Sequence, residues 1–142
     1  TPFGKLSMLL TTDVNTFEPA RIASRLGAEM LICPDLFLGQ HTPMDSADGL
    51  NLRVLENGIY GVLPTLVGDT GLGISLGKRS RVYAPPEITF SPNTDSVLYK
   101  ARYRDRNQLL MAPLSFEALE EATKRNTDTN PEFYKNQKSY LF

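Results

Sequence analysis

The chain has 142 residues, and its 15 Lys and Arg against 16 Asp and Glu give a formal net charge of −1. This balance argues against a nucleic-acid binder and against a polybasic membrane-surface protein, because both usually carry a basic excess. No apolar run reaches the roughly 18 residues of a membrane span. The composition is that of one globular domain. The chain has one cysteine, Cys33, which excludes an internal disulfide and a multi-Cys metal site, and one histidine, His41, which excludes a multi-His metal site. We expect no metal and no other cofactor.

The first part of the sequence predicts a β-α-β unit. Apolar runs at residues 5–10 and 29–33 read as buried strands. Between them, Asp13 or Thr16 can cap a helix over residues 17–27 that ends at a glycine. Two strands joined by such a helix are expected to be parallel, which indicates an α/β protein. Because the sequence starts with Thr and enters a strand at once, we interpret it as a processed product or as part of something larger.

The middle of the sequence predicts a loop, a helix and a strand in succession. The loop covers residues 34–46, the helix 48–57, and the strand 59–66, which Pro64 interrupts. The glycine-rich stretch 68–77 matches neither the GxGxxG nor the Walker spacing, so it predicts no phosphate-binding loop.

The last part predicts more sheet, one helix and a tail. The three further strands are expected over residues 81–90, 96–103 and 108–113, with a turn at 91–95. Ser115 can cap a helix over residues 116–125. The tail 126–142 is polar but ends in aromatic residues, which we expect to pack on the domain or to dock on a partner.

Three blocks of sequence follow one another along the chain: GKLSMLLTTD at 4–13, LGAEMLICP at 26–34 and LRVLENGIYGV at 52–62. Together they resemble the C-terminal half of the nitrilase superfamily domain, the carbon–nitrogen hydrolases. FEPA at 17–20 and GLGI at 71–74 resemble the vanin and biotinidase branch most. LLMA at 109–112, with the helix after it, resembles the closing strand and helix of the family, so the resemblance spans about residues 4–125.

A competing interpretation places the chain in the N-terminal half of the same domain. PDLFLG at 34–39 resembles the family segment that supplies the general-base glutamate, and the acid would then be Asp35. We prefer the C-terminal half, because the 52–62 block and the closing helix fit only that half.

The resemblance implies half of a four-layer α-β-β-α sandwich with mixed sheets. Residues 1–125 would form the C-terminal portion of the domain and residues 126–142 its tail. Half a sandwich exposes a sheet face, so we expect a protein partner or an N-terminal half to complete it, in a dimer or a larger assembly. Vanin-like proteins are secreted or membrane-anchored, which favours an extracellular location, although the lone cysteine gives this no support.

The family's nucleophilic cysteine falls on Thr11 in this alignment. A threonine hydroxyl lacks the thiolate fraction and the nucleophilicity of a cysteine, and the general base and oxyanion lysine would belong to the other half. We therefore expect a catalytically degenerate chain with a structural or interaction role. The alternative is an amidase, pantetheinase-like and acting on linear amides, whose site another chain or a missing N-terminal half completes.

Several other residues are candidates for a site. Thr12 and Asp13 accompany Thr11 at the predicted elbow as binding residues, and helix capping is the preferred role of Asp13. Glu56 is the third candidate binding residue, and it is interpreted as a hydrogen-bonding residue of its helix rather than as a catalyst. The remaining expectations are a buried, inert Cys33, an exposed His41, and a solvated basic turn at 78–81 in preference to an anion site.

Overall fold

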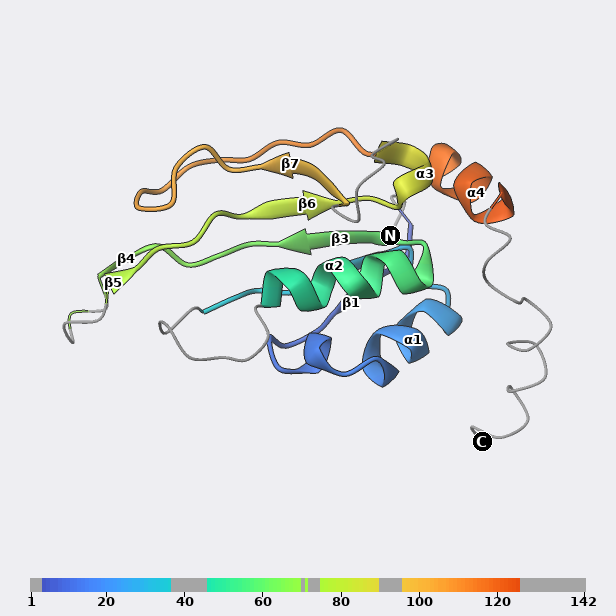
Figure 1. Cartoon of the computed structure of the whole chain (residues 1–142), viewed down its shortest axis with the longest axis horizontal. Helices are drawn as coiled ribbons and strands as arrows, with labels where there is room; N and C mark the ends of the chain where they lie inside the picture. The colour runs from blue at the N-terminus through green and yellow to red at the C-terminus, as the bar shows by residue number, and fades with distance from the viewer. Residues whose placement is uncertain (1–3, 37–45, 70, 72–74, 90–95, 126–142) are drawn as a thin grey trace.

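A computed structural model describes residues 4–36, 46–69, 71, 75–89 and 96–125 of the chain (Figure 1). The strands are β1 Leu6–Met8, β2 Met30–Ile32, β3 Tyr60–Leu63, β4 Gly68–Asp69, β5 Ser75–Leu76, β6 Arg81–Tyr83 and β7 Val97–Lys100. The helices are the 3-10 turn η1 Asp13–Asn15, then α1 Glu18–Arg25, α2 Ser46–Asn57, α3 Pro86–Thr89 and α4 Phe116–Arg125. No helix in these ranges is long and apolar enough to cross a bilayer.

Five of the strands form one mixed sheet in the order β1-β2-β3-β6-β7. Strands β1, β2 and β3 are parallel, with Leu6, Met30 and Tyr60 in register, and β6 and β7 continue the sheet antiparallel. Strands β4 and β5 form a separate two-stranded ribbon. The predicted β-α-β unit and the α/β class are therefore confirmed.

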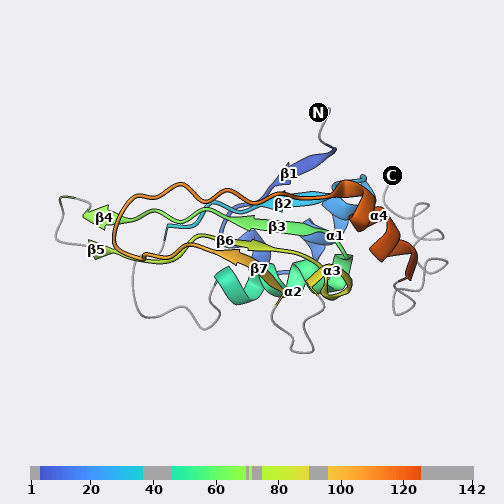
Figure 2. The same ribbon diagram turned by 90° about the horizontal axis from the view of Figure 1, so that it is seen from above.

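Helices α1 and α2 lie together on one face of this sheet (Figures 1 and 2). Leu50 and Val54 of α2 are fully buried and share a core with Leu31 of β2. Gly61 of β3 permits this close packing, because a Cβ built on it would lie 2.6 Å from Cγ2 of Val54. A larger residue there would push α2 away from the sheet.

The opposite face of the sheet is covered at one end by α4. Leu119 of α4 packs with Tyr60, whose hydroxyl donates a 2.8 Å hydrogen bond to the carbonyl of Ser115. The rings of Tyr60 and Phe116 meet edge to face with centroids 5.8 Å apart. Helix α4 does not cover this face at β1, where Met8 is 68% exposed.

Several boundaries differ from the sequence prediction. The strand expected over residues 108–113 is wrong: these residues have no strand structure, and the side chains of Leu109 and Met111 are 85% and 78% exposed. The strand expected over residues 81–90 ends at Tyr83, since the prolines at 85 and 86 lead into the short helix α3. His41, the turn at 91–95, the tail 126–142 and most of the GLGI segment lie outside the described residues.

Candidate functional site

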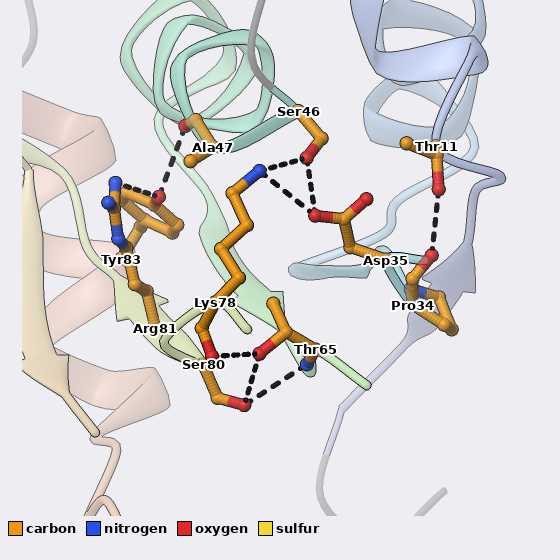
Figure 3. Close-up of polar contacts among 10 residues, drawn as sticks. All are labelled: Thr11, Pro34, Asp35, Ser46, Ala47, Thr65, Lys78, Ser80, Arg81 and Tyr83. Carbon is orange, nitrogen blue, oxygen red and sulfur yellow. Dashed lines mark hydrogen bonds and ion pairs between the residues drawn. The ribbon is translucent and has the colours of Figure 1, made fainter. Parts of the chain in front are cut away.

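The carboxyl ends of the three parallel strands meet at one edge of the sheet, the usual place for a site in an α/β protein. Thr11 follows β1, Pro34 and Asp35 follow β2, and Thr65 follows β3. The backbone N–H of Asp35 donates to the carbonyl of Pro64 (2.9 Å), and Asp35 and Thr65 form a parallel bridge. Figure 3 shows this edge.

Thr11, the residue at the predicted nucleophile position, is half-buried and already hydrogen-bonded. Its hydroxyl donates to the backbone carbonyl of Pro34 across a 3.0 Å distance (Figure 3). The hydroxyl proton is thus held by a peptide carbonyl, which is too weak a base to activate the oxygen for attack.

The two residues after Thr11 have backbone roles. The carboxylate of Asp13 accepts a 2.9 Å hydrogen bond from the N–H of Leu10, so it closes the turn after β1. The expectation that Asp13 or Thr16 caps the following helix is wrong, because the N-cap of α1 is Phe17 and has no side-chain capping bond. Thr12 is exposed, and its carbonyl accepts from the N–H of Asn15 in η1.

A buried ionic cluster of Asp35, Ser46 and Lys78 lies at the same edge (Figure 3). The ammonium of Lys78 lies 3.1 Å from Oδ2 of Asp35 and 3.0 Å from Oγ of Ser46, and the Ser46 hydroxyl donates to the same carboxylate oxygen at 2.7 Å. The side chains of Asp35 and Lys78 are only 2% and 10% exposed. The cluster joins the end of β2, the first residue of α2 and the segment between β5 and β6.

Sequence reasoning missed this cluster. Asp35 is a candidate only in the competing N-terminal interpretation, and the sequence places Lys78 in a solvated basic turn. For Lys78 that assignment is wrong, because its charge is buried against Asp35, whereas Arg79 is exposed as expected. One feature of the sequence could have indicated Asp35 as a site residue. It follows an apolar strand and a proline, which places its carboxylate directly at the end of a buried strand.

Cys33 lies in the core between the sheet and the helices and is fully buried, as predicted. Burial raises the pKa of its thiol from 9.0 to about 11, and the negative charges of Asp35 and Asp13 act in the same direction, while Lys78 opposes them. At pH 7 such a thiol is ionised to about one part in ten thousand. Cys33 is therefore unreactive in this fold.

Glu56 is separate from this edge. It lies ten residues beyond Ser46 along α2, a distance of about 15 Å at the rise of an α-helix. Its carboxylate pairs with the guanidinium of Arg53 at 3.2 Å, and the side-chain amide of Asn57 donates to the carbonyl of Arg53 at 2.8 Å. These contacts fit the hydrogen-bonding role expected for Glu56. No group of three His, Cys, Asp or Glu side chains in the described part of the chain could hold a metal ion.

The amino-acid sequence matches no protein-family model and no curated protein. The fold, however, is similar to that of several solved structures. Nit3 of Saccharomyces cerevisiae, a member of branch 10 of the nitrilase superfamily, superposes with a TM-score of 0.68 and 17% identity over 89% of this chain. A carbon–nitrogen hydrolase from Helicobacter pylori gives 0.66 and 23% over 94%, and an amidase of the nitrilase superfamily from Nesterenkonia gives 0.60 and 26% over 92%.

The chain spans less than half the length of these proteins, covering 43%, 49% and 43% of them in the same order. Their shared fold has four layers, α-β-β-α, and the mixed sheet described above, with helices α1 and α2 on one face, corresponds to it. Over the residues described, this chain therefore has the carbon–nitrogen hydrolase fold of the nitrilase superfamily.

Proposed function

We propose that this chain is a catalytically degenerate carbon–nitrogen hydrolase-like protein with a structural or interaction role in a larger assembly. The carrying observation is Thr11, which stands at the end of β1 with its hydroxyl hydrogen-bonded to the carbonyl of Pro34. In one structure of the Nesterenkonia amidase, acrylamide has added to the active-site cysteine. Here the one thiol of the chain, Cys33, is buried in the core with a pKa raised to about 11.

We further propose that the chain corresponds to the C-terminal half of the domain and to its vanin-like branch. The LRVLENG block supports the first point, because it forms the end of α2 and leads directly into β3, as in the family segment it resembles. The assignment to the vanin-like branch rests on two segments of sequence. One is FEPA, which begins at the N-cap of α1, and the other is the glycine-rich GLGI.

The partner that we propose is the complementary half of the same fold, on this polypeptide or on another chain. Leu6 and Met8 of β1 are 44% and 68% exposed on the sheet face opposite to α2. The segment between β7 and α4, which carries the exposed Leu109 and Met111, runs on that same side (Figure 2). Exposed apolar side chains at both edges of one sheet face support an interaction surface there, and a second sheet is what the α-β-β-α fold places on that face.

Association of the chain tests this proposal. We expect the isolated 142 residues to self-associate or to melt without cooperativity in size-exclusion chromatography and calorimetry. In the assembly, Met8→Glu should weaken association, because it places a charge on the apolar face. The matched control is Leu26→Glu, since Leu26 at the end of α1 is equally exposed, at 65%. A compact, cooperatively melting monomer, or equal effects of the two variants, would contradict the proposal.

One observation favours the alternative, an amidase whose site another chain or an N-terminal half completes. Amide hydrolysis needs a nucleophile, a carboxylate and a cation, and Asp35 and Lys78 form an acid–lysine pair close enough to Cys33 to act on its pKa. The discriminating measurement is ammonia or amine release from linear amides, including pantetheine-like ones, by the assembly. Turnover that is lost in Cys33→Ala would establish the alternative, and the absence of turnover would support the degenerate chain.

A further inference from the structure

Two basic runs, separate in the sequence, lie side by side in the fold. Residues 78–81 (KRSR) and 100–106 (KARYRDR) contain seven of the 15 Lys and Arg of the chain and one acidic residue, Asp105. Strands β6 and β7 pair Arg81 with Lys100, and the N–H of Ala101 donates to the carbonyl of Ser80 at 2.9 Å. A chain with a net charge of −1 thus gathers a local positive excess at one place.

A cavity of about 290 Å³ opens between these runs and the end of β3. We call it the β6–β7 cavity. The residues with polar side chains that line it are Thr65, Lys78, Ser80, Tyr103, Arg106, Asn107 and Gln108, and the ammonium of Lys78 is paired with Asp35. None of the lining residues among those the structure describes is an Asp or a Glu. The wall therefore offers hydroxyl, amide and guanidinium donors, and the carboxylate beside its guanidinium is that of Asp105.

The segment that carries Arg106 is held in place by its own contacts. The side-chain amide of Gln108 donates to the carbonyl of Tyr103 at 2.7 Å and accepts from the N–H of Arg102 at 3.1 Å. The guanidinium of Arg106 lies 4.5 Å from the centroid of the Tyr103 ring. This stacking orients the guanidinium at the cavity before any ligand arrives. Its contact with Asp105 is long, at 3.5 Å, and both side chains are mostly exposed, so an anion can compete with it.

The opposite wall presents a second oriented donor. The hydroxyl of Thr65 donates to the carbonyl of Lys78 at 3.0 Å, and the N–H of Thr65 donates to Oγ of Ser80, also at 3.0 Å. With the Thr65 proton engaged in this way, the 3.2 Å contact between the two hydroxyls is donated by Ser80. An anion in the cavity can accept the hydrogen bond of the Ser80 hydroxyl in place of Thr65, whose own hydroxyl stays bonded to the carbonyl of Lys78.

We propose that the β6–β7 cavity is a binding site for a small anion, either a phosphate group or a carboxylate. Arg106, Ser80 and Asn107 supply the donors, and the charge-assisted bonds of Arg106 supply most of the affinity. A volume of about 290 Å³ suits a small molecule. The inference does not depend on the degenerate role proposed above, because Thr11 does not line the cavity, although Thr65 and Lys78 belong to the same edge of the sheet.

Isothermal titration calorimetry of the assembled protein at low salt tests this site, with inorganic phosphate and malonate as probes and neutral malonamide as the uncharged analogue. We expect saturable 1:1 binding of phosphate or malonate and none of malonamide, with an affinity that falls as NaCl is raised. The probe that binds more tightly identifies the anionic group. Arg106→Gln should weaken binding about tenfold, and Asn107→Ala should weaken it less.

The matched control is Arg21→Gln, because Arg21 also lies over an aromatic ring, that of Phe17, but on α1. Its affinity should equal that of the unmodified chain. Circular dichroism melting of each variant ensures that the fold is intact, and Arg106 is 63% exposed, so its replacement leaves the core unchanged. The absence of saturable binding, or equal losses in Arg106→Gln and Arg21→Gln, would overturn the proposal.

Discussion

At the scale of single residues, two buried groups at the sheet edge control the local chemistry. The ammonium of Lys78 is a buried charge, and its partner Asp35 is buried even more completely. Two such charges are tolerated in a core only as a pair, because each alone would lose its hydration without replacement. Cys33 lies two residues before Asp35 on the chain and experiences both charges.

Lys78→Met should therefore lower the free energy of unfolding by about 3 kcal/mol, since it leaves the carboxylate of Asp35 buried without a cation. Urea denaturation of the assembled protein, the material for every stability measurement below, measures the change. The double variant Asp35→Asn, Lys78→Met should recover part of the loss. The control is Glu120→Gln, which breaks the exposed pair of Glu120 and Lys124 on α4 and should leave the midpoint unchanged. Equal effects at the two pairs would contradict the buried cluster.

The Cys33 thiol makes stability depend on alkaline pH. Folding raises its pKa from 9.0 to about 11, so between these values the unfolded chain has lost a proton that the native chain keeps. The free energy of unfolding should accordingly fall as pH rises from about 9 to 11. The contribution of the protonated Cys33 thiol to stability is fully present below pH 9. Urea midpoints measured across this range should decline more steeply for the unmodified chain than for Cys33→Ala. Parallel declines would show that Cys33 is not the group responsible.

At the scale of elements, the close contact of α2 with β3 fixes the layer of helices on the sheet. It depends on Gly61, where any side chain would meet Val54 and Leu50 of α2. It also sets the position of Ser46, the first residue of α2, beside Asp35. The packing of one helix thus positions one member of the buried cluster.

Gly61→Ala should destabilise the fold by about 1–3 kcal/mol, because its Cβ would lie 2.6 Å from Cγ2 of Val54. Adding Val54→Ala removes the clashing methyl groups, so the double variant should lose less than the sum of the single losses. Thermal melting of the four proteins completes this cycle. Strict additivity would mean that Gly61 is required for another reason.

At the scale of the whole molecule, the chain covers less than half of each of the proteins whose fold it shares. Its sheet has helices on one face and exposed apolar side chains on part of the other. The proposed partner would cover that second face. Whether a functional pocket then forms around Thr11 depends on what the other half contributes, and a change at Thr11 can reveal it.

In the complete assembly, Thr11→Cys should react with an activated ester or amide and gain the mass of the acyl group. A cysteine supplies the thiolate that threonine lacks, and the remaining groups of the pocket would act on the bound carbonyl. Intact-mass spectrometry detects the adduct. Thr12→Cys is the matched control, because it places an exposed thiol one residue away. If neither variant reacts, or both react equally, no oxyanion-binding pocket has survived at Thr11.

The sequence by itself determined the first elements of the chain and their order. The apolar runs around Leu31 and the helical pattern ended by Gly27 predict a parallel β-α-β unit, because burial of one face imposes a period that each segment shows alone. The burial of Cys33 follows from its place at the end of such a run. The three sequence blocks also pointed to the fold that the solved structures share.

Only the tertiary structure decided which distant residues meet. Lys78 is 43 residues from Asp35, and no local pattern distinguishes a lysine in a solvated turn from one that reaches a buried carboxylate. The same holds for the two basic runs. Neither run alone indicates a site, and together they form a cavity wall because β6 pairs with β7. The segment 108–113 shows the converse, since its apolar residues predict a strand but no neighbouring strand in the described chain pairs with them. Charge pairing and strand pairing are properties of the folded arrangement, because both depend on contacts between segments remote in sequence.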